Sequence, residues 1–526
     1  MRTRLHHLLE EQATRDALRP ALSSGDVTLD YGALSERVRI VAHGLTELGL
    51  DRGDRVAVYL DKRLETVETI FAASAADLVF VPVNPLLKAA QVAHVLADCD
   101  VRVLVTTRTR WQQLAVEVSG LPALEHVVLV ADPRPVDLPV VAGGPTMHEY
   151  VDLGHRGSPA DLVPASDVDL DVAAILYTSG STGRPKGVVL SHRNLVVGAE
   201  SVSTYLGNDE DDVILAALPL SFDAGLSQVT TGFAVGAHVV LVNYLLPADV
   251  VRLCARHGVT GLTCVPPLWL QLAALEWPEE ATRRLRYFAN TGGRMPRHTL
   301  SRLREIFPGA APYLMYGLTE AFRSTYLDPA EADRRPDSIG KAIPNAEILV
   351  VRPDGALAAP GEHGELVHRG PLVALGYWND VERTQRRFRP VPGEVPGWRQ
   401  PELAVWSGDT VVADADGFLY FVGRDDDMIK TSGYRVSPTE VEEAAYATGL
   451  VGDVVALGLE DAALGQRIVM VATAAGAGPL DAPALLSELR RTLPRFMVPG
   501  EVRELDRLPR SPNGKFDRVL LRKEVS

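Results

Sequence analysis

The stretch YTSGSTGRPKGVVLSH, Tyr177–His192, is rich in glycine and small hydroxyl residues, and Lys186 follows them. Such residues let several backbone N–H groups approach one ligand and point at it together, which forms a nest for phosphate oxygens. A lysine at the edge of this nest adds a positive charge on a flexible stem. The stretch therefore predicts a phosphate-binding loop, and composition alone leaves a flexible surface loop as the alternative.

This loop differs from the P-loop of nucleoside triphosphatases. Read from Gly180, its sequence is GSTGRPKG, so Pro185 stands where the second invariant glycine belongs. Gly187 stands where a Ser or Thr would hold magnesium in that motif. We therefore expect a loop that holds phosphates in an enzyme of another kind.

Outward from this loop, short β-rich runs alternate with segments of helical apolar spacing. The clearest runs are Asp54–Leu60, Phe80–Asn84, Val101–Thr107 and His126–Asp132. A second series of runs follows the loop, and each of them ends near a helical pattern or a Gly/Pro turn. This rhythm predicts the α/β class, with mostly parallel sheets covered by helices.

The character of the chain changes after about Ile343. Two short strand patterns flanked by Pro/Gly turns predict a hairpin and a β-rich subdomain. From Val441 a compact α+β pattern remains, long enough for a small mobile domain. We place the joint in the charged segment GRDDD, which gives two domains, residues 1–425 and 426–526.

Composition narrows the class of protein. The sequence has no apolar run of membrane-spanning length, and its N-terminus lacks the apolar core of a signal peptide. Three cysteines without CxxC spacing, Cys99, Cys254 and Cys264, predict reduced core thiols and a cytoplasmic protein. The net charge of −15 argues against a broad nucleic-acid-binding surface.

Lysine is scarce in this chain. Only seven of the 53 basic residues are lysines, so arginine serves wherever a generic surface cation suffices. A retained lysine is therefore a mild sign that a compact point charge is needed. For Lys62, Lys88 and Lys523 we nevertheless favour an ordinary surface position.

Six segments in order resemble the adenylate-forming superfamily, which includes acyl-CoA synthetases, peptide-synthetase adenylation domains and luciferases. Besides the opening loop, they are Asn290–Pro296 (NTGGRMP), Tyr316–Glu320 (YGLTE), Trp406–Thr410 (WSGDT), Gly423–Glu442 (GRDDDMIKTSGYRVSPTEVE) and Leu508–Arg518 (LPRSPNGKFDR). The resemblance covers nearly the whole chain. It implies an ATP-dependent ligase that joins a carboxylic acid to a thiol, with ATP and Mg²⁺ as cofactors.

The resemblance assigns roles to residues of these segments. The catalytic group comprises Thr178, Lys186, Glu320 and Lys515, with Glu320 as the metal ligand. The ATP- and AMP-binding group comprises Thr178, Ser179, Gly180, Ser181, Thr182, Gly183, Lys186, Asn290, Gly292, Gly293, Tyr316, Gly317, Thr319, Asp409, Arg424 and Lys515. The chemistry agrees, since a carboxylate attacking the α-phosphate needs cations that neutralise the phosphates. Asp409 offers two acceptor oxygens that suit a ribose diol.

The resemblance also implies two conformations. The C-terminal domain would turn between the two half-reactions, taking Lys515 out of the site and bringing the loop of Gly433 in. Asp426 matches the hinge position, where a backbone change would be absorbed. Lys430 and Gly433 would line the tunnel for the pantetheine thiol.

The acid pocket is predicted from aligned wall positions. These are Phe222, Asp223, Ala224, Ser227, Cys264, Ala289, Thr291, Met315 and Arg323. An aspartate facing an apolar pocket is costly unless a cation joins it, and a substrate ammonium would supply one. The alternative is that Asp223 caps the following helix. Arg323 could meet a second acid group of the substrate or serve a structural pair, and we favour the structural pair.

These features predict a ligase for a small amino acid that acts on a separate carrier protein. The chain resembles stand-alone L-prolyl ligases, and equally the AMP-forming acyl-CoA ligases of exopolysaccharide-associated clusters. A CoA ligase for a non-amino carboxylic acid is therefore the alternative, and CoA or a carrier protein would be the partner. A non-catalytic nucleotide-binding relative is disfavoured by the retention of Glu320, Asp409, Lys430 and Lys515.

Overall fold

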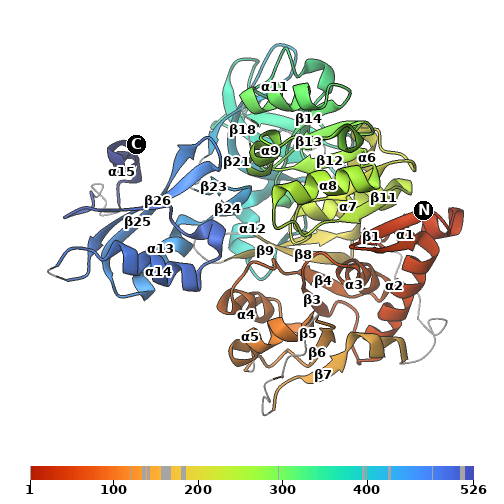
Figure 1. Cartoon of the computed structure of the whole chain (residues 1–526). Coiled ribbons are helices and arrows are strands. Elements are labelled where there is room, and N and C mark those ends of the chain that lie inside the picture. The colour runs from red at the N-terminus through yellow and green to blue at the C-terminus, as the bar shows by residue number, and fades with distance from the viewer. Residues whose placement is uncertain are drawn as a thin grey trace.

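The structure is a computed structural model of the whole chain. It describes residues 2–118, 120–132, 138, 143–155, 168–178, 185–293, 295, 297–393, 397–398, 400–424, 428–476, 478–509 and 516–525. Within these ranges the chain forms three sheets and the helices around them (Figure 1).

The first sheet has eight strands. In spatial order they are β19 (Gly376–Tyr377), β9 (Lys186–Ser191), β8 (Val172–Thr178), β4 (Val79–Pro82), β3 (Arg55–Tyr59), β5 (Val101–Thr107), β6 (His126–Val130) and β7 (Thr146–Glu149). The run from β8 to β7 is parallel, and β9 joins β8 in antiparallel register. The four strand segments predicted here are confirmed to within two residues at each end.

The second sheet is longer and changes character along its length. In order it contains β17 (Glu347–Val351), β18 (His363–Arg369), β21 (Leu403–Ala413), β22 (Leu419–Arg424), β16 (Ser338–Ala342), β15 (Thr325–Leu327), β14 (Ala311–Tyr316), β13 (Tyr287–Asn290), β12 (Gly261–Cys264), β10 (Val213–Ala216), β11 (His238–Leu241), β1 (Pro20–Ser24) and β2 (Val27–Asp30), with β20 (Phe388–Pro390) paired to β21. From β14 to β1 neighbouring strands are parallel, and the remaining pairs are antiparallel. The predicted hairpin is the β17–β18 pair.

Helices fill the space between the two sheets and cover their outer faces. The inner layer holds α1 (His7–Arg15), α2 (Tyr31–Thr46), α3 (Leu64–Ala75), α6 (His192–Leu206) and α7 (Asp223–Val235). The outer face of the first sheet carries α4 (Ala89–Asp98) and α5 (Arg108–Val118). The outer face of the second carries α8 (Pro247–His257), α9 (Pro266–Ala273), α10 (Glu279–Thr282) and α11 (Arg297–Ile306). Buried side chains alternate between inner and outer cores along these strands, as sheets covered on both faces require.

Shorter helical segments complete this part of the chain. They are α12 (Val381–Arg387) and the 3₁₀ turns η1 (Tyr150–His155), η3 (Thr319–Ala321) and η4 (Pro329–Glu331). None of the helices in the described ranges is both long and apolar enough to span a lipid bilayer.

The C-terminal part has its own sheet and core. Its strands are β24 (Tyr434–Val436), β23 (Ile429–Thr431), β26 (Gly465–Ala474) and β25 (Val451–Asp461), with β27 (Glu501–Glu504) paired to β26. One face is covered by α13 (Pro438–Ala447), α14 (Ala482–Thr492) and the turn η5 (Arg495–Met497), and the other by α15 (Arg518–Val525). The α/β class with a large N-terminal and a small C-terminal part is confirmed. The boundary at 425/426 stays a prediction, because it falls on residues outside the described ranges.

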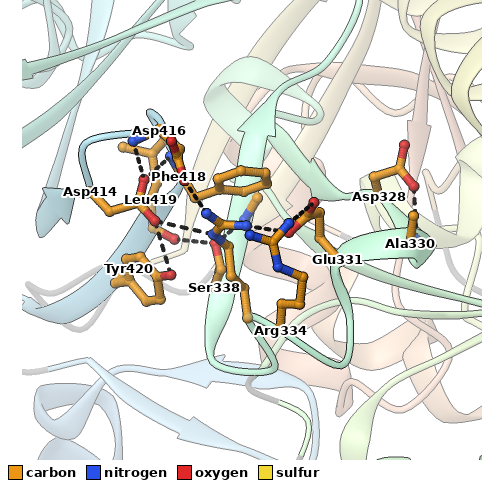
Figure 2. Close-up of polar contacts among 12 residues, drawn as sticks. Asp328, Ala330, Glu331, Arg334, Ser338, Asp414, Asp416, Phe418, Leu419 and Tyr420 are labelled. Carbon is orange, nitrogen blue, oxygen red and sulfur yellow. Dashed lines mark hydrogen bonds and ion pairs between the residues drawn. The ribbon is translucent and has the colours of Figure 1, made fainter.

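Arg335 fixes the β21–β22 hairpin, whose first strand carries Asp409. Its guanidinium binds Glu331, Asp414 and Asp416 and lies over the ring of Phe418. Figure 2 labels these four partners. This network joins the η4 turn to the hairpin.

Candidate active site

One cavity of about 1510 Å³ lies where strands of both N-terminal sheets end and the C-terminal sheet approaches. Most of the predicted site residues in the described ranges line it. They are Thr178, Phe222, Asp223, Ala224, Asn290, Thr291, Gly292, Gly293, Met315, Tyr316, Gly317, Thr319, Arg323, Asp409, Lys430 and Gly433. Carboxyl ends of parallel strands meet at one sheet edge, so residues far apart in sequence gather there.

Three predicted pocket residues do not line the cavity, which corrects the sequence alignment. Cys264 packs in the outer core under α8 and α9, and Ala289 packs in the inner core. Ser227 is buried on α7, where its hydroxyl lies 3.4 Å from that of Thr231. Along a strand each second side chain faces the same way, and these two strand residues face packed cores.

Several predicted residues lie outside the described ranges. They are Ser179, Gly180, Ser181, Thr182, Gly183, Asp426 and Lys515. Arg424 ends β22, and the description there covers its backbone. Their roles stay predictions.

Lys186 and Glu320 form a buried ion pair behind the cavity wall. The Lys186 ammonium donates to Glu320 Oε1 at 2.7 Å and to the Tyr377 hydroxyl at 2.8 Å, and that hydroxyl donates to Glu320 Oε1 at 2.6 Å. Lys186 starts β9, Glu320 lies in η3 and Tyr377 ends β19, so three distant segments meet. Tyr377 is a functional candidate that the sequence gave no sign of.

Burial and charge act in opposite directions on this pair. Burial lowers the pKa of Lys186 to about 8 although Glu320 raises it. For Glu320, burial raises the pKa, but the charges of Lys186, Arg387 and Arg435 prevail and hold it well below its usual range. The second carboxylate oxygen, Glu320 Oε2, is buried and has no hydrogen-bond partner among the described residues. A hard cation such as Mg²⁺ fits a buried, ionised carboxylate with a spare oxygen.

Asp223 already has a cation beside it. Arg323 Nη1 donates to Asp223 Oδ2 at 3.0 Å and to the Phe322 carbonyl at 3.0 Å. Burial raises the pKa of Asp223, and Arg323 opposes that shift. Asp223 is the first residue of α7 and Phe222 is its cap residue, so Asp223 lies in the first turn and not at the N-cap. The backbone N–H of Ala224 also bonds its carboxylate, which lowers its pKa. The structural pair favoured for Arg323 is the one that the structure has.

Of the nucleotide-binding candidates, Asn290 and Tyr316 end the neighbouring strands β13 and β14, and Asp409 lies within β21. The Tyr316 hydroxyl, at the end of β14, donates to Asp409 Oδ2 on β21. The amide of Asn290 donates to the carbonyl of Gly293 at 2.8 Å, which fixes the turn after β13. Tyr316 and Asp409 thus lie within contact distance on the same wall.

The C-terminal part reaches the cavity through the loop of Gly433. A Cβ built on Gly433, at φ +81°, would lie 2.9 Å from Val265 Cγ1, so only glycine fits there without a shift. The ring of Tyr434 stacks on that of Phe496, with 3.7 Å between the ring centroids. It meets the ring of Phe222 edge-on, with 5.1 Å between the centroids. Lys430 lies 4.4 Å over the ring of Phe421. This loop therefore borders both the acid pocket and the joint between the two parts.

Comparison with known proteins decides the family. Residues 9–378 match the family described as AMP-binding enzyme, and residues 440–515 match its C-terminal domain. The chain belongs to the AMP-binding enzymes. The predicted adenylate-forming superfamily is thereby confirmed, and this AMP-binding enzyme is an AMP-forming acid–thiol ligase.

Its relatives differ in acid and acceptor. An L-proline–[L-prolyl-carrier protein] ligase of Streptomyces coelicolor is 34% identical over 522 residues, 97% of this chain and 94% of that protein. A feruloyl-CoA synthase of an Amycolatopsis species is 32% identical over 503 residues, 94% of each chain. The solved structure of an o-succinylbenzoate CoA synthetase from Bacillus subtilis aligns with TM-score 0.83 and 25% identity over 98% of each chain. The AMP-binding enzyme thus activates a carboxylic acid, and its relatives include users of both acceptors.

Lys62 is a further residue of the cavity and not the surface residue that its sequence context favoured. It is buried, lines the cavity, and donates from Nζ to the carbonyls of Ala217 (2.6 Å) and Leu218 (3.3 Å). Burial lowers its pKa to about 7. The scarcity of lysine was the signal that could have found it.

Proposed function

We propose that this AMP-binding enzyme activates a small amino acid as its acyl-adenylate and transfers it to the pantetheine thiol of a separate carrier protein. The observation that carries the proposal is that, of the two paired residues that line the cavity, Asp223 is more exposed than Arg323. The Asp223 side chain is 15% exposed and the Arg323 side chain 3%. A substrate in this pocket therefore meets a carboxylate acceptor in front of a withdrawn guanidinium.

An acceptor at the pocket wall favours a substrate that carries a donor. An ammonium group meets Asp223 with charge assistance, whereas a second acid group of the substrate is repelled by it. Phe222, Ala224 and Met315 supply apolar walls beside it. The relative that is named as an L-proline ligase supports the same class of substrate.

The first half-reaction uses the opening loop and the ion pair behind it. The substrate carboxylate attacks the α-phosphorus of ATP, and pyrophosphate leaves. We assign Lys186 to the leaving phosphates, which requires its bond to Glu320 to open. The Thr178 hydroxyl is buried and has no hydrogen-bond partner among the described residues. We assign it to a phosphate oxygen of ATP. From the family resemblance, Lys515 bridges the carboxylate and the α-phosphate.

Mg²⁺ would be held by Glu320, and when bound it neutralises phosphate oxygens of ATP. The buried free oxygen Glu320 Oε2 supports this assignment. Asp409 and Tyr316 are assigned to the ribose and adenine, next to Asn290 and Gly292.

In the second half-reaction a pantetheine sulfur attacks the acyl carbon, and AMP leaves. The Gly433 loop lies at the cavity in this structure, against Val265 and close to Gly292. That position supports the conformation assigned to thioester formation, in which this loop replaces Lys515.

The second candidate is a CoA ligase for an acid without an amine. The specific observation in its favour is the same ion pair, because Arg323 already compensates the charge of Asp223. The burial of Asp223 therefore does not require a substrate cation. The relative that is named as a feruloyl-CoA synthase supports this candidate.

Acid-dependent pyrophosphate exchange separates the candidates. Each small amino acid is compared with the same acid lacking its amine, and aromatic and fatty acids complete the panel. The proposal expects exchange with one amino acid and at least ~10-fold less with its des-amino partner. Exchange that is confined to acids without an amine, followed by thioester formation with free CoA, would establish the second candidate.

A further inference from the structure

The segment between Glu320 and Arg323 contains an unusual backbone. Phe322 has φ +58° and ψ −59°, and the N–H of Arg323 donates to the carbonyl of Ala321 at 2.6 Å. This i→i+2 bond with positive φ is the rare and strained form of the γ-turn. A residue other than glycine keeps this backbone conformation only when the surrounding structure holds it there.

Two functional side chains flank the centre of this turn and bind different partners. Glu320 precedes the turn and binds Lys186, and Arg323 is its last residue and binds Asp223. The carbonyl of Glu320 accepts from the N–H of Ala374 at 2.9 Å. The carbonyl of Phe322 itself accepts from Arg323 Nη1, so the turn and the ion pair share a hydrogen bond.

A fully buried ring holds the turn in place. Phe322 is 0% exposed, and its ring lies against Gly198 of α6. A Cβ built on Gly198 would lie 2.6 Å from Phe322 Cδ1, so the ring occupies the space that this glycine leaves. Helix α6 directly follows β9, the strand that starts with Lys186. One helix thus borders both the ring and the lysine strand.

We propose that Phe322 is a positioning residue: its ring, seated on Gly198, holds the γ-turn that sets Glu320 toward the phosphate side and Arg323 toward the acid side. The inference rests on the proposed roles of Glu320 and Asp223. It adds that the two sides are fixed by one element, so a shift of the ring impairs both together.

Gly198→Ala tests this, because the new methyl group pushes the ring without touching the cavity. The matched control is Gly232→Ala on α7, where a Cβ would lie 2.5 Å from Val239 Cγ2, away from the turn. Both variants are assayed at a temperature where melting curves show them folded. Exchange is measured with whichever acid the wild-type protein uses, so an error in the proposed acid class does not affect the test. Mg²⁺–ATP binding is measured separately by calorimetry without any acid.

We expect Gly198→Ala to raise the KM for the acid and weaken Mg²⁺–ATP binding, each by ~10-fold or more, and Gly232→Ala to stay within ~2-fold. Phe322→Leu, a second variant, should show the same joint loss. The double variant Gly198→Ala/Phe322→Leu should recover part of it, because the smaller side chain makes room for the methyl group. Three outcomes would overturn the proposal. The first is that the losses of acid and Mg²⁺–ATP affinity scale with melting temperature in both glycine variants. The others are a loss of affinity for only one of the two ligands, and additive losses in the double variant.

Discussion

Asp223 and Arg323 form an ion pair with both side chains largely withdrawn from solvent, so each charge offsets the burial of the other. The burial of a charged residue points to a ligand only when the protein supplies no counter-charge. Asp223 was expected to pair with a substrate cation, but Arg323 of the same chain supplies that cation. What remains for the substrate is the acceptor surface that Asp223 exposes.

Asp223→Asn keeps the shape and an acceptor for Arg323 but removes the negative charge. With an amine-bearing acid we expect kcat/KM in pyrophosphate exchange to fall roughly 100-fold, about 2.7 kcal/mol. The des-amino acid should be unaffected or favoured. Asp223→Ala should in addition lower stability by ~3–5 kcal/mol, because it leaves a buried guanidinium alone. Equal losses for both acids with Asp223→Asn would leave Asp223 a structural role only.

Lys62 predicts a pH dependence of stability. Burial lowers its pKa from 10.5 to about 7, so the folded protein binds fewer protons than the unfolded chain between these values. The free energy of unfolding should therefore rise with pH from about 7 to 10.5, by ~1 kcal/mol per pH unit from this group. Lys62→Met should flatten that rise, which urea unfolding at pH 7, 8.5 and 10 measures.

The matched control is Lys523→Met, which removes an exposed lysine of α15. Its unfolding curve should keep the wild-type pH dependence. If Lys62→Met keeps it too, the ammonium of Lys62 is not desolvated in the folded protein.

The sequence predicted the site residues that belong to motifs, but it did not predict the residues that contact them from elsewhere in the chain. Glu320, Asp409 and Gly433 lie in ordered motifs whose spacing is fixed by local chemistry. Tyr377 and Lys62 carry no such spacing, because their contacts arise from strands and loops between 57 and 191 residues away. Whether Cys264 and Ala289 face a pocket depends on strand register, which an alignment of single positions does not give.

Helix α7 is tied to the second sheet by one side chain. Gln228 accepts from the N–H of Leu218 at 3.0 Å and donates to the carbonyls of Leu215 and Thr263, each at 3.1 Å. These bonds hold the loop that leads from β10 to Asp223. Lys62 holds the same loop from the first sheet, so the acid pocket is braced from two elements.

Gln228→Leu removes three hydrogen bonds to buried backbone groups, of which the carbonyl of Leu215 keeps the N–H of Ala217 as a donor. Since each such group costs ~1–3 kcal/mol, we expect a loss of several kcal/mol in the free energy of unfolding. The KM for the acid should also rise, because the loop before Asp223 loses its anchor. Urea unfolding and pyrophosphate exchange measure the two effects. Gln271→Leu on the exposed face of α9 is the control, and a similar loss there would contradict this account.

The strands and helices themselves could largely be predicted from the sequence. Apolar runs of the first sheet are buried on both faces, so composition alone marks them. The order of the strands was not readable, because β8, β9 and β19 come together from residues 172–191 and 376–377. The γ-turn at Phe322 was likewise invisible, since propensity argues against positive φ for a bulky residue.

At the scale of the whole molecule, α4 and α13 meet across the joint between the two parts. Gln91 on α4 donates to Glu440 Oε1 on α13 at 2.8 Å, and the same amide lies 3.8 Å from Met497 Sδ. Burial raises the pKa of Glu440 to about 7, while the hydrogen bond from Gln91 opposes the shift and the charge of Glu443 adds to it. An exposed glutamate titrates near 4.5, so protons are linked to the docking of the C-terminal part.

The sign of this linkage follows from the raised pKa. Between about 4.5 and 7 the docked form holds a proton that the undocked form has lost, so docking weakens as pH rises through this window. Above about 7 both forms are ionised, and docking no longer changes with pH. Glu440→Gln cannot ionise and should dock equally well at pH 5.5 and pH 8.

The measurement is energy transfer between dyes on the two parts. The three native cysteines are buried, so cysteines introduced at the exposed positions Val116 and Arg491 can be labelled selectively. We expect wild-type protein to show more of the docked form at pH 5.5 than at pH 8, and Glu440→Gln to lose this difference. Glu524→Gln changes an exposed carboxylate of α15, on the other face of the C-terminal sheet, and should retain it. A pH-independent signal in wild-type protein, or the same response in all three proteins, would show that Glu440 does not couple protonation to docking.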